Sequence, residues 1–338
     1  METPILAKVI RGETVESVHR GHLIAIGGDG KVHLNIGDPQ MVTYFRSSAK
    51  PFQAMPFITS GAADAFGFTE DEIAMACASH SGERMHVEIA ARMLANIGLS
   101  ESDLRCGKHL PFYEKEAERM QRANETVTQL HNNCSGKHAA MLAFAKHVGA
   151  DIGTYDQFEN PIQQSVLNAV STFCEIPVED IAIGIDGCCA PNFAMPLAAM
   201  ARGFLNLVAP PDDFTDEATR SAAKRIVSAM LKYPELIGGT ERLDTILMQA
   251  APGAFISKVG ADGVWLCGIL PSEKYPKGLA IALKIEDGDD KRARPVVAVE
   301  VLKQLGILPN DALPGLSPLA ITNRRGDAVG SVIAQISI

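Results

Sequence analysis

The chain has 338 residues, enough to bury a large core in one big domain or two small ones. It is 46% hydrophobic and 21% charged, with a formal net charge of −9 and no basic run. Nucleic-acid binding is therefore not expected, because affinity for phosphate needs clustered lysines and arginines.

Membrane insertion, secretion and disulfide bonding are not expected either. No apolar stretch is long enough to span a bilayer, and the first residues lack the apolar run of a secretory signal. The seven cysteines are odd in number and lack the spacing of a disulfide framework, which favours reduced thiols in the cytoplasm.

The first third of the chain predicts strands. Residues 5–11 form a short apolar run. Residues 22–26 and 31–36 flank Gly27-Gly28-Asp29-Gly30, a turn sequence typical of a hairpin.

The middle of the chain predicts helices. A capping-box sequence at residues 69–72 precedes an apolar segment, and the helical spacing of residues 84–97 ends at Gly98. Further helices are expected at residues 137–148, 161–173 and 216–231.

The last third predicts strands again. The expected strands are residues 254–259, 263–270, 278–285 and 327–338, with a helix at residues 295–305. The order strands, helices, strands predicts an α+β fold with a central, mostly antiparallel sheet from both chain ends and an inserted helical lobe. We expect a single domain over residues 1–338, with the sheet layer at approximately 1–60 and 235–338 and the helical lobe at approximately 61–234.

Ser47 and Lys50 form a Ser-x-x-Lys sequence that ends in Pro51. A serine hydroxyl is a poor nucleophile until a base takes its proton, and a helix that starts here places the lysine amine one turn from the serine. We expect such a helix, with Ser47 or Ser48 as its cap and Pro51 in its first turn. Taken alone, the spacing favours an ordinary capped helix with a solvated lysine.

Two further segments strengthen the catalytic interpretation. Ser79 begins a stretch of small, hydroxyl-bearing residues that interrupts a helix, and Lys258 lies where a strand enters a hairpin. Penicillin-recognising enzymes combine Ser-x-x-Lys, a second serine on a loop of the helical lobe and Lys-Thr-Gly on a strand, in this order. The chain has the same order, with Val259 in place of the threonine. Without the other segments, Lys258 would be interpreted as a surface lysine.

Thiols and polar residues concentrate at residues 131–138 and 186–191. Zinc favours thiolates and imidazoles in a tetrahedral shell. The segments lack Cys-x-x-Cys and histidines at i, i+4, so their spacing alone favours buried reduced thiols. A catalytic pair of Cys134 with His131 or His138 is a further option.

Six segments together resemble the L-asparaginase II family (class 3, Rhizobium etli type). They are VESVHRGHLIAI, YFRSSAKPFQAMPF, CASHSGERMHV, NNCSGKHAAML, GIDGCCAPNFAMPLAAMA and FISKVGADGV, in the order of the family. The resemblance implies an amidohydrolase that converts L-asparagine to L-aspartate and ammonia. It also implies a fold akin to serine β-lactamases and glutaminases, and a homodimer.

The resemblance further implies two serine–lysine pairs. Ser47 with Lys50 would be nucleophile and base, and Ser79 with Lys258 would assist as a proton relay. The expected mechanism is acyl transfer, in which backbone N–H groups stabilise the oxyanion and water then cleaves a β-aspartyl ester.

A zinc ion is the third implication. Its ligands would be Cys134, Lys137, Cys188 and a water, with Asp186 close by. A lysine ligand must be neutral, and burial and the metal charge both lower the pKa of such an amine. Cys189 follows Cys188 directly, so the assignment between the two stays open. We expect zinc to orient the substrate, and attack by zinc hydroxide is the second mechanism.

Candidates for holding the substrate carboxylate, its amine or the metal-bound water are Arg46, His138 and Asp186. Three alternative functions remain. One is a serine amidase for glutamine or a β-lactam, because one methylene shifts discrimination by only about 10–200-fold. The others are a non-catalytic zinc–thiolate binding protein and a thiol hydrolase that uses Cys134.

Overall fold

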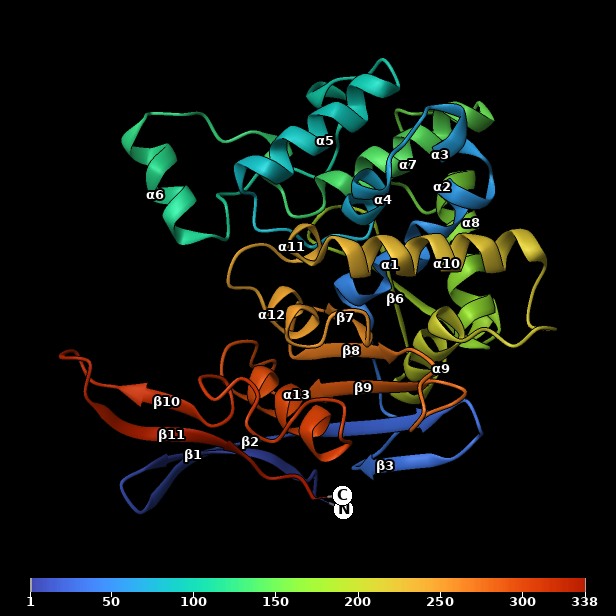
Figure 1. The fold of residues 1–338 in the computed structure, drawn as a ribbon. Helices are drawn as coiled ribbons and strands as arrows, with labels where there is room; N and C mark the ends of the chain where they lie inside the picture. The colour runs from blue at the N-terminus through green and yellow to red at the C-terminus, as the bar shows by residue number, and fades with distance from the viewer. Residues whose placement is uncertain (1, 338) are drawn as a thin grey trace. The chain divides into compact units, whose positions relative to one another are not determined.

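The computed structural model describes residues 2–337, which group into two compact units (Figure 1). The sheet unit contains the chain up to Ser48, Met195–Leu205, and the chain from Leu247 on. The helical unit contains Ala49–Ala194 and Asn206–Ile246. That the two units form a single domain stays a prediction.

Within the described residues, the sheet unit is built on an eight-stranded sheet in the order β10-β11-β1-β2-β9-β8-β7, with β3 also paired to β2. The strands are β1 (Ile5–Arg11), β2 (Thr14–Gly27), β3 (Val32–Ile36), β7 (Phe255–Val259), β8 (Val264–Ile269), β9 (Leu279–Ile285), β10 (Leu319–Thr322) and β11 (Ala328–Ala334). Neighbouring strands run antiparallel throughout this sheet. The prediction of an antiparallel sheet from both chain ends is confirmed.

The centre of the sheet is buried and mostly apolar. Every residue of β7, β8 and β9 is buried, as expected of strands covered on both sides. Helix α13 (Ala293–Gln304) packs against β1, β8, β9 and β11. The hairpin between β7 and β8 turns through Gly263, whose φ of +77° favours glycine.

The helical unit surrounds α7 (Ser135–Val148), a helix of small and apolar residues that is buried from Ser135 to Ala145. The other helices of this unit are α1 (Lys50–Gln53), α2 (Met55–Thr59), α3 (Ala62–Ala65), α4 (Glu70–Ala76), α5 (Arg84–Asn96), α6 (Glu114–Arg122), α8 (Pro161–Cys174), α10 (Glu217–Lys232) and α11 (Pro234–Ile237). Helix α7 contacts α2, α3, α4, α5 and α8. It is therefore the scaffold of this unit.

Several short elements complete the chain. They are β4 (Val42–Tyr44), β5 (Ala182–Ile185), β6 (Pro191–Pro196), α9 (Leu197–Val208), α12 (Leu243–Ala250) and the 3-10 turns η1 (Arg46–Ala49), η2 (Glu101–Asp103), η3 (Gln129–His131) and η4 (Val178–Asp180). The unit boundary runs through β6, α9 and α12. Within residues 2–337, every helix is too short or too polar to cross a lipid bilayer.

The capping box predicted at residues 69–72 is confirmed, but the cap predicted for the helix of the serine–lysine pair is wrong. Glu72 closes the box at the start of α4, and Asp216, where no cap was predicted, caps α10. Neither Ser47 nor Ser48 caps α1, because a 3-10 turn precedes this helix and its cap position is Ala49, which has no side-chain oxygen. Ser48 Oγ instead donates to Phe45 O at 2.5 Å.

Proline lies in the first turn of both α1 and α8, as predicted. The closing strand is shorter than expected and ends at Ala334, and Ile338 lies outside the described residues.

Candidate functional site

The amine of Lys50 is buried in the helical unit and makes three hydrogen bonds. The side chain is 1% exposed at the start of α1. Its Nζ donates to Ala78 O at 2.6 Å, to Ser79 Oγ at 2.9 Å and to Asn133 O at 3.1 Å. These three acceptors match the three donors of an ammonium group.

Of the three groups bonded to Lys50 Nζ, only the Ser79 hydroxyl can also donate a proton to it. A carbonyl oxygen only accepts, so a neutral Lys50 keeps its two hydrogens on the Ala78 and Asn133 carbonyls. Its lone pair then faces Ser79 Oγ, which donates its own hydrogen. The separation lies in the range of about 2.6–3.2 Å that general-base catalysis requires. Lys50 and Ser79 can therefore exchange a proton directly.

Ser79 lies on the loop between α4 and α5, which interrupts the helical stretch as predicted. Its N–H donates to Ile237 O at 2.8 Å. On the same loop, His80 Nδ1 accepts the Gly82 N–H, so its Nε2–H donates to Ser135 Oγ at 2.9 Å. His80 thus ties the loop to the start of α7 and is not a free base.

The predicted metal ligands also meet in the helical unit. Cys134 stands before α7, Lys137 lies in its first turn, and Cys188 lies on the loop between β5 and β6. Lys137 Nζ donates to Cys188 Sγ at 3.0 Å. Cys188 is 4% exposed, whereas Cys189 is exposed and has a φ of +71°. The structure therefore places Cys188 beside Lys137.

The pKa values of the two thiols are shifted in opposite directions. The hydrogen bond between them raises the pKa of Cys134 well above its ordinary value, and burial adds to this. The same hydrogen bond lowers the pKa of Cys188 well below its ordinary value, and the Lys137 ammonium lowers it further. These directions favour a protonated Cys134 and a protonated Lys137 beside an ionised Cys188.

The amine of Lys137 differs from the sequence expectation. Burial lowers its pKa, but the charges of Cys188 and Cys134 outweigh burial and raise it. The Asp186 carboxylate, which accepts the Gly187 N–H at 2.8 Å, acts in the same direction. Burial thus acts on the Lys137 pKa in the expected direction, but the neighbouring thiols, which the expectation did not include, outweigh it.

Sulfur and nitrogen donors of this kind fit zinc. Among residues 2–337, no group of three or more His, Cys, Asp or Glu side chains is arranged to hold a metal, so an ion here needs Lys137 as its third donor. Lys137 Nζ and Cys188 Sγ already lie 3.0 Å apart, so both could bind one ion. The donors fit zinc once Cys134 and Lys137 lose their protons.

His138 cannot serve as a base for Cys134. Tyr155 Oη accepts the Arg105 N–H at 3.0 Å, so its own hydrogen goes to His138 Nδ1 at 2.7 Å. The neutral ring therefore carries its hydrogen on Nε2, which has no lone pair to accept a proton from Cys134. Burial also lowers the pKa of His138, and the neighbouring Cys188 offsets this only in part.

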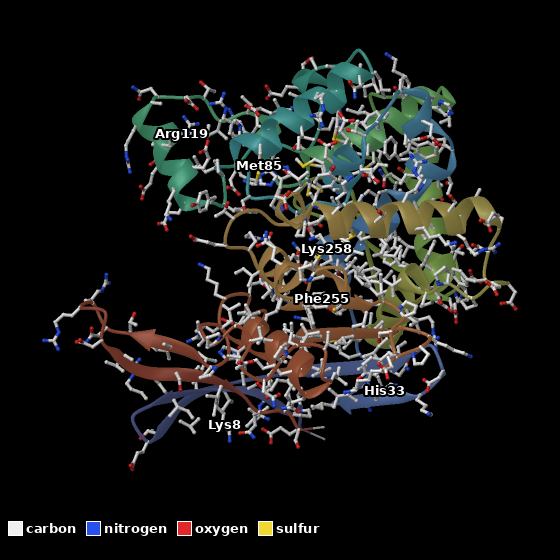
Figure 2. All side chains as sticks on the ribbon, in the orientation of Figure 1. Lys8, His33, Met85, Arg119, Phe255 and Lys258 are labelled. Carbon is white, nitrogen blue, oxygen red and sulfur yellow. The ribbon has the colours of Figure 1, made fainter. Side chains whose placement is uncertain are left out.

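Three predicted site residues lie in the sheet unit. Ser47 is half-buried in η1, and Arg46 forms an ion pair with Asp262. Lys258 is fully buried on β7 (Figure 2), where its Nζ donates to Val259 O at 3.2 Å, so the surface-lysine interpretation is wrong. The pairings of Ser47 with Lys50 and of Ser79 with Lys258 stay predictions.

Sequence reasoning missed Asn133, Tyr155 and His109. Asn133 belongs to the polar segment 131–138. The one feature of the sequence that could have indicated its role is its position directly before Cys134, a candidate metal ligand. Tyr155 and His109 are single polar residues in loops, where no periodicity marks a partner.

Comparison with known proteins supports one family. The model of the L-asparaginase II family matches residues 7–334. No curated protein matches the sequence.

Similar solved structures are distant. They include the Bacillus subtilis glutaminase in covalent complex with 5-oxo-L-norleucine, with 12% identity, coverage of 85% of this chain and 87% of that chain, and a TM-score of 0.39. A carbapenemase from Vibrio cholerae has 16% identity, coverage of 83% and 94%, and a TM-score of 0.36. A β-lactamase from Sphaerobacter thermophilus has 13% identity, coverage of 86% and 92%, and a TM-score of 0.42. Matches this distant say nothing of the activity.

The family match, in contrast, spans nearly the whole chain. It includes the residues around Lys50 and the group of Cys134, Lys137 and Cys188. The protein belongs to the L-asparaginase II family and is an amidohydrolase.

Proposed function

We propose that the protein is an L-asparaginase that hydrolyses L-asparagine to L-aspartate and ammonia with a serine–lysine pair. Membership of the L-asparaginase II family supports the substrate. The observation that carries the chemistry is the 2.9 Å bond between Lys50 Nζ and Ser79 Oγ, with the other two Lys50 bonds on carbonyls. Ser79 is a hydroxyl with which this buried amine can exchange a proton, and the pairing of Lys50 with Ser47 is part of the proposal.

The first half-reaction forms an ester. Ser47 Oγ attacks the side-chain amide carbon of asparagine, and its proton goes to Lys50. Lys50 then passes a proton to Ser79 Oγ, while Ser79 hands its own hydrogen to the leaving nitrogen. The C–N bond breaks, ammonia leaves, and a β-aspartyl ester remains on Ser47. Lys258 is proposed to support Ser79 in this relay.

The second half-reaction runs through the same groups in reverse. Water gives one proton to the Ser79–Lys50 pair and attacks the ester carbon. The C–O bond to Ser47 breaks, Ser47 takes the proton back, and aspartate leaves. The amine is neutral again at the end of the cycle, so no proton is gained or lost by the enzyme.

A zinc ion held by Cys134, Lys137 and Cys188 is part of the proposal. When bound, it would supply positive charge that orients an oxygen of the substrate. The chain's own contribution is to hold the donors together, since Cys188 already binds both Cys134 and Lys137. Arg46, Asp186 and His138 stay candidates for contacts to the substrate or to a metal-bound water.

The first experiment compares substrates and traps the nucleophile. Ammonia release should be faster with asparagine than with glutamine, and a β-lactam should not be turned over. A diazoketone analogue of asparagine should alkylate Ser47, which peptide mass mapping would identify. Absence of ammonia release from asparagine by zinc-loaded protein would reject the asparaginase.

A thiol hydrolase is the second candidate, because the lowered pKa of Cys188 is a property of nucleophilic thiols. Cys134 is the weaker nucleophile, since its pKa is raised and His138 offers it no base. A diazoketone adduct on cysteine instead of serine would favour this candidate.

We also propose a cytoplasmic homodimer. All seven cysteines are free thiols in the structure, which suits a reducing compartment. Light scattering should give about twice the chain mass of 36.1 kDa.

A further inference from the structure

His109 is an obligatory acceptor for the backbone of Asn133. Its Nδ1 lies 2.7 Å from Leu110 O, and a carbonyl only accepts, so the hydrogen of the neutral ring is on Nδ1. Nε2 therefore carries a lone pair, and it accepts the Asn133 N–H at 3.0 Å. The ring is half-buried on the loop before α6.

Asn133 touches both members of the Lys50–Ser79 pair. Its carbonyl accepts from Lys50 Nζ at 3.1 Å, and its side-chain Nδ2 donates to Ser79 Oγ at 3.4 Å. Its Oδ1 lies 3.3 Å from His109 Nε2, a contact between two acceptors and not a hydrogen bond, and 3.5 Å from Cys134 Sγ. Because one residue supplies all these groups, a rotation of its backbone would displace them together.

We propose that His109 is a positioning residue for the Lys50–Ser79 pair, acting through Asn133. By accepting the backbone N–H of Asn133, His109 holds the Asn133 carbonyl in its hydrogen bond with Lys50. It also holds the side-chain amide of Asn133 in its hydrogen bond with Ser79. The inference rests on the proposed function, in which Lys50 and Ser79 exchange protons. Loss of the acceptor leaves the Asn133 N–H unpaired, and a displacement of about 1 Å at a reacting group can cost about 100-fold in rate.

Stacking holds the His109 ring independently of its hydrogen bonds. The ring lies on Phe112 with 4.5 Å between centroids and 12° between planes, and the Arg242 guanidinium covers Phe112 at 5.5 Å. The Phe112 N–H donates to Ser81 O at 2.8 Å, on the same loop as Ser79. A phenylalanine at position 109 would therefore keep the stack and lose only the polar contacts.

Two substitutions in the full chain test the proposal. His109→Phe removes the acceptor, and His109→Gln restores one, because its Oε1 can accept the Asn133 N–H. His109→Phe should lower kcat by about 10–100-fold with KM changed by less than about 3-fold, and His109→Gln should stay within about 3-fold of the wild type in both. Hydrogen exchange at the Asn133 amide should accelerate at least about 10-fold in His109→Phe and not in His109→Gln.

The matched control is His86→Phe. His86 also accepts a backbone N–H, from Glu83 at 3.1 Å, and also stacks on a ring, that of His80. It should lose stability and keep kcat within about 3-fold, because Glu83 does not bind Lys50. Should His109→Phe not fold, His109→Leu carries the same expectations.

An unchanged kcat in a folded variant that lacks the acceptor would overturn the proposal, as would an unchanged exchange rate at Asn133. Absence of asparagine hydrolysis by the wild type would instead reject the proposed function. The exchange comparison between His109→Phe and His109→Gln would then still decide whether His109 holds Asn133.

Discussion

Lys50 Nζ lies 2.9 Å from Ser79 Oγ, and the other hydrogen bonds of this amine end on the carbonyls of Ala78 and Asn133. The family resemblance assigns Lys50 to Ser47 and Ser79 to Lys258. The geometry of the helical unit adds a direct link between the two proposed pairs. In the proposed mechanism, a proton that Lys50 takes from Ser47 would pass to Ser79 directly, without a mobile water.

The first prediction separates the roles of the two serines. Ser47→Ala should lower kcat by at least about 1000-fold and abolish the diazoketone adduct, because the covalent route is lost. Ser79→Ala should lower kcat by about 100–10000-fold, the usual range for loss of acid–base help, and keep slow adduct formation on Ser47. Steady-state kinetics and intact-protein mass spectrometry measure both effects.

The neighbouring Ser48 supplies the control for both serine variants. Its Oγ is buried and donates to Phe45 O, so Ser48→Ala should lower the free energy of unfolding by about 0.5–1.5 kcal/mol and keep kcat. Near wild-type turnover in Ser47→Ala would contradict the serine mechanism and favour attack by zinc hydroxide.

The second prediction identifies the sulfur ligands. Cys134→Ser and Cys188→Ser should each lose stoichiometric zinc, because both thiols lie in the buried group around Lys137. Cys189→Ser should retain the metal, since Cys189 is exposed. Elemental analysis of protein purified without chelators checks the set, and zinc lost with Cys189 but kept with Cys188 would shift the assignment by one residue.

The third prediction is the pH dependence of zinc affinity. The pKa values of Cys134 and Lys137 are raised in the metal-free group, so both bind protons that zinc must displace. Affinity should rise with pH across the range from about 6.5 to 8.5, by up to about 10-fold per pH unit for each proton released. Competition with a zinc-binding dye measures this, and a flat profile would show that neither group loses a proton on binding.

Local patterns predicted the helices and strands well because their causes are local. The apolar spacing of α5 lies within the helix, and the capping residues of α4 and α10 lie within or directly before theirs. The cap of α1 was predicted wrongly because a 3-10 turn, which begins at Arg46 with a left-handed φ of +52°, places the start of α1 at Lys50 and leaves Ser47 before the cap position.

Site residues could be predicted only where they belong to a recognisable sequence motif. Ser79 and Lys50 are far apart in the sequence, and their bond depends on the packing of α1 against the loop after α4. The acceptor role of His109 follows from a tautomer that Leu110 O fixes, which no residue pattern encodes. The net pKa shift of Lys137 could not be read from the sequence, because burial and the neighbouring thiols act on it in opposite directions and their balance depends on distances.

The fourth prediction concerns stability in mild acid. Burial lowers the pKa of both His80 and His86, which stack 4.8 Å apart. Their ordinary value in the unfolded chain is about 6.5, so below that pH the unfolded state binds more protons than the native state. The free energy of unfolding should be fully retained above about pH 6.5 and fall as pH drops toward 5, by up to about 1.4 kcal/mol per pH unit for each histidine.

Urea unfolding at pH 7.5 and 5.5 measures this effect, with EDTA present so that zinc release does not contribute. His86→Asn retains an acceptor for the Glu83 N–H but has no group that titrates in this range, so its stability should depend less on pH. An equal pH dependence in the variant would exclude His86 from the effect.

The fifth prediction tests the packing that holds the thiol group in place. Gly136 lies between Cys134 and Lys137 on α7, and a Cβ there would meet Met75 O of α4 at 2.3 Å. Helix propensity alone would favour alanine by about 1 kcal/mol. We expect Gly136→Ala to lower the free energy of unfolding by about 1–3 kcal/mol, because a backbone carbonyl cannot yield as a side chain can. Gly187→Ala is the matched control, since Gly187 also adjoins a proposed ligand but a Cβ there would meet no atom within 4 Å. Urea unfolding of the two variants measures the difference, and equal stabilities would show that α7 and α4 can separate without cost.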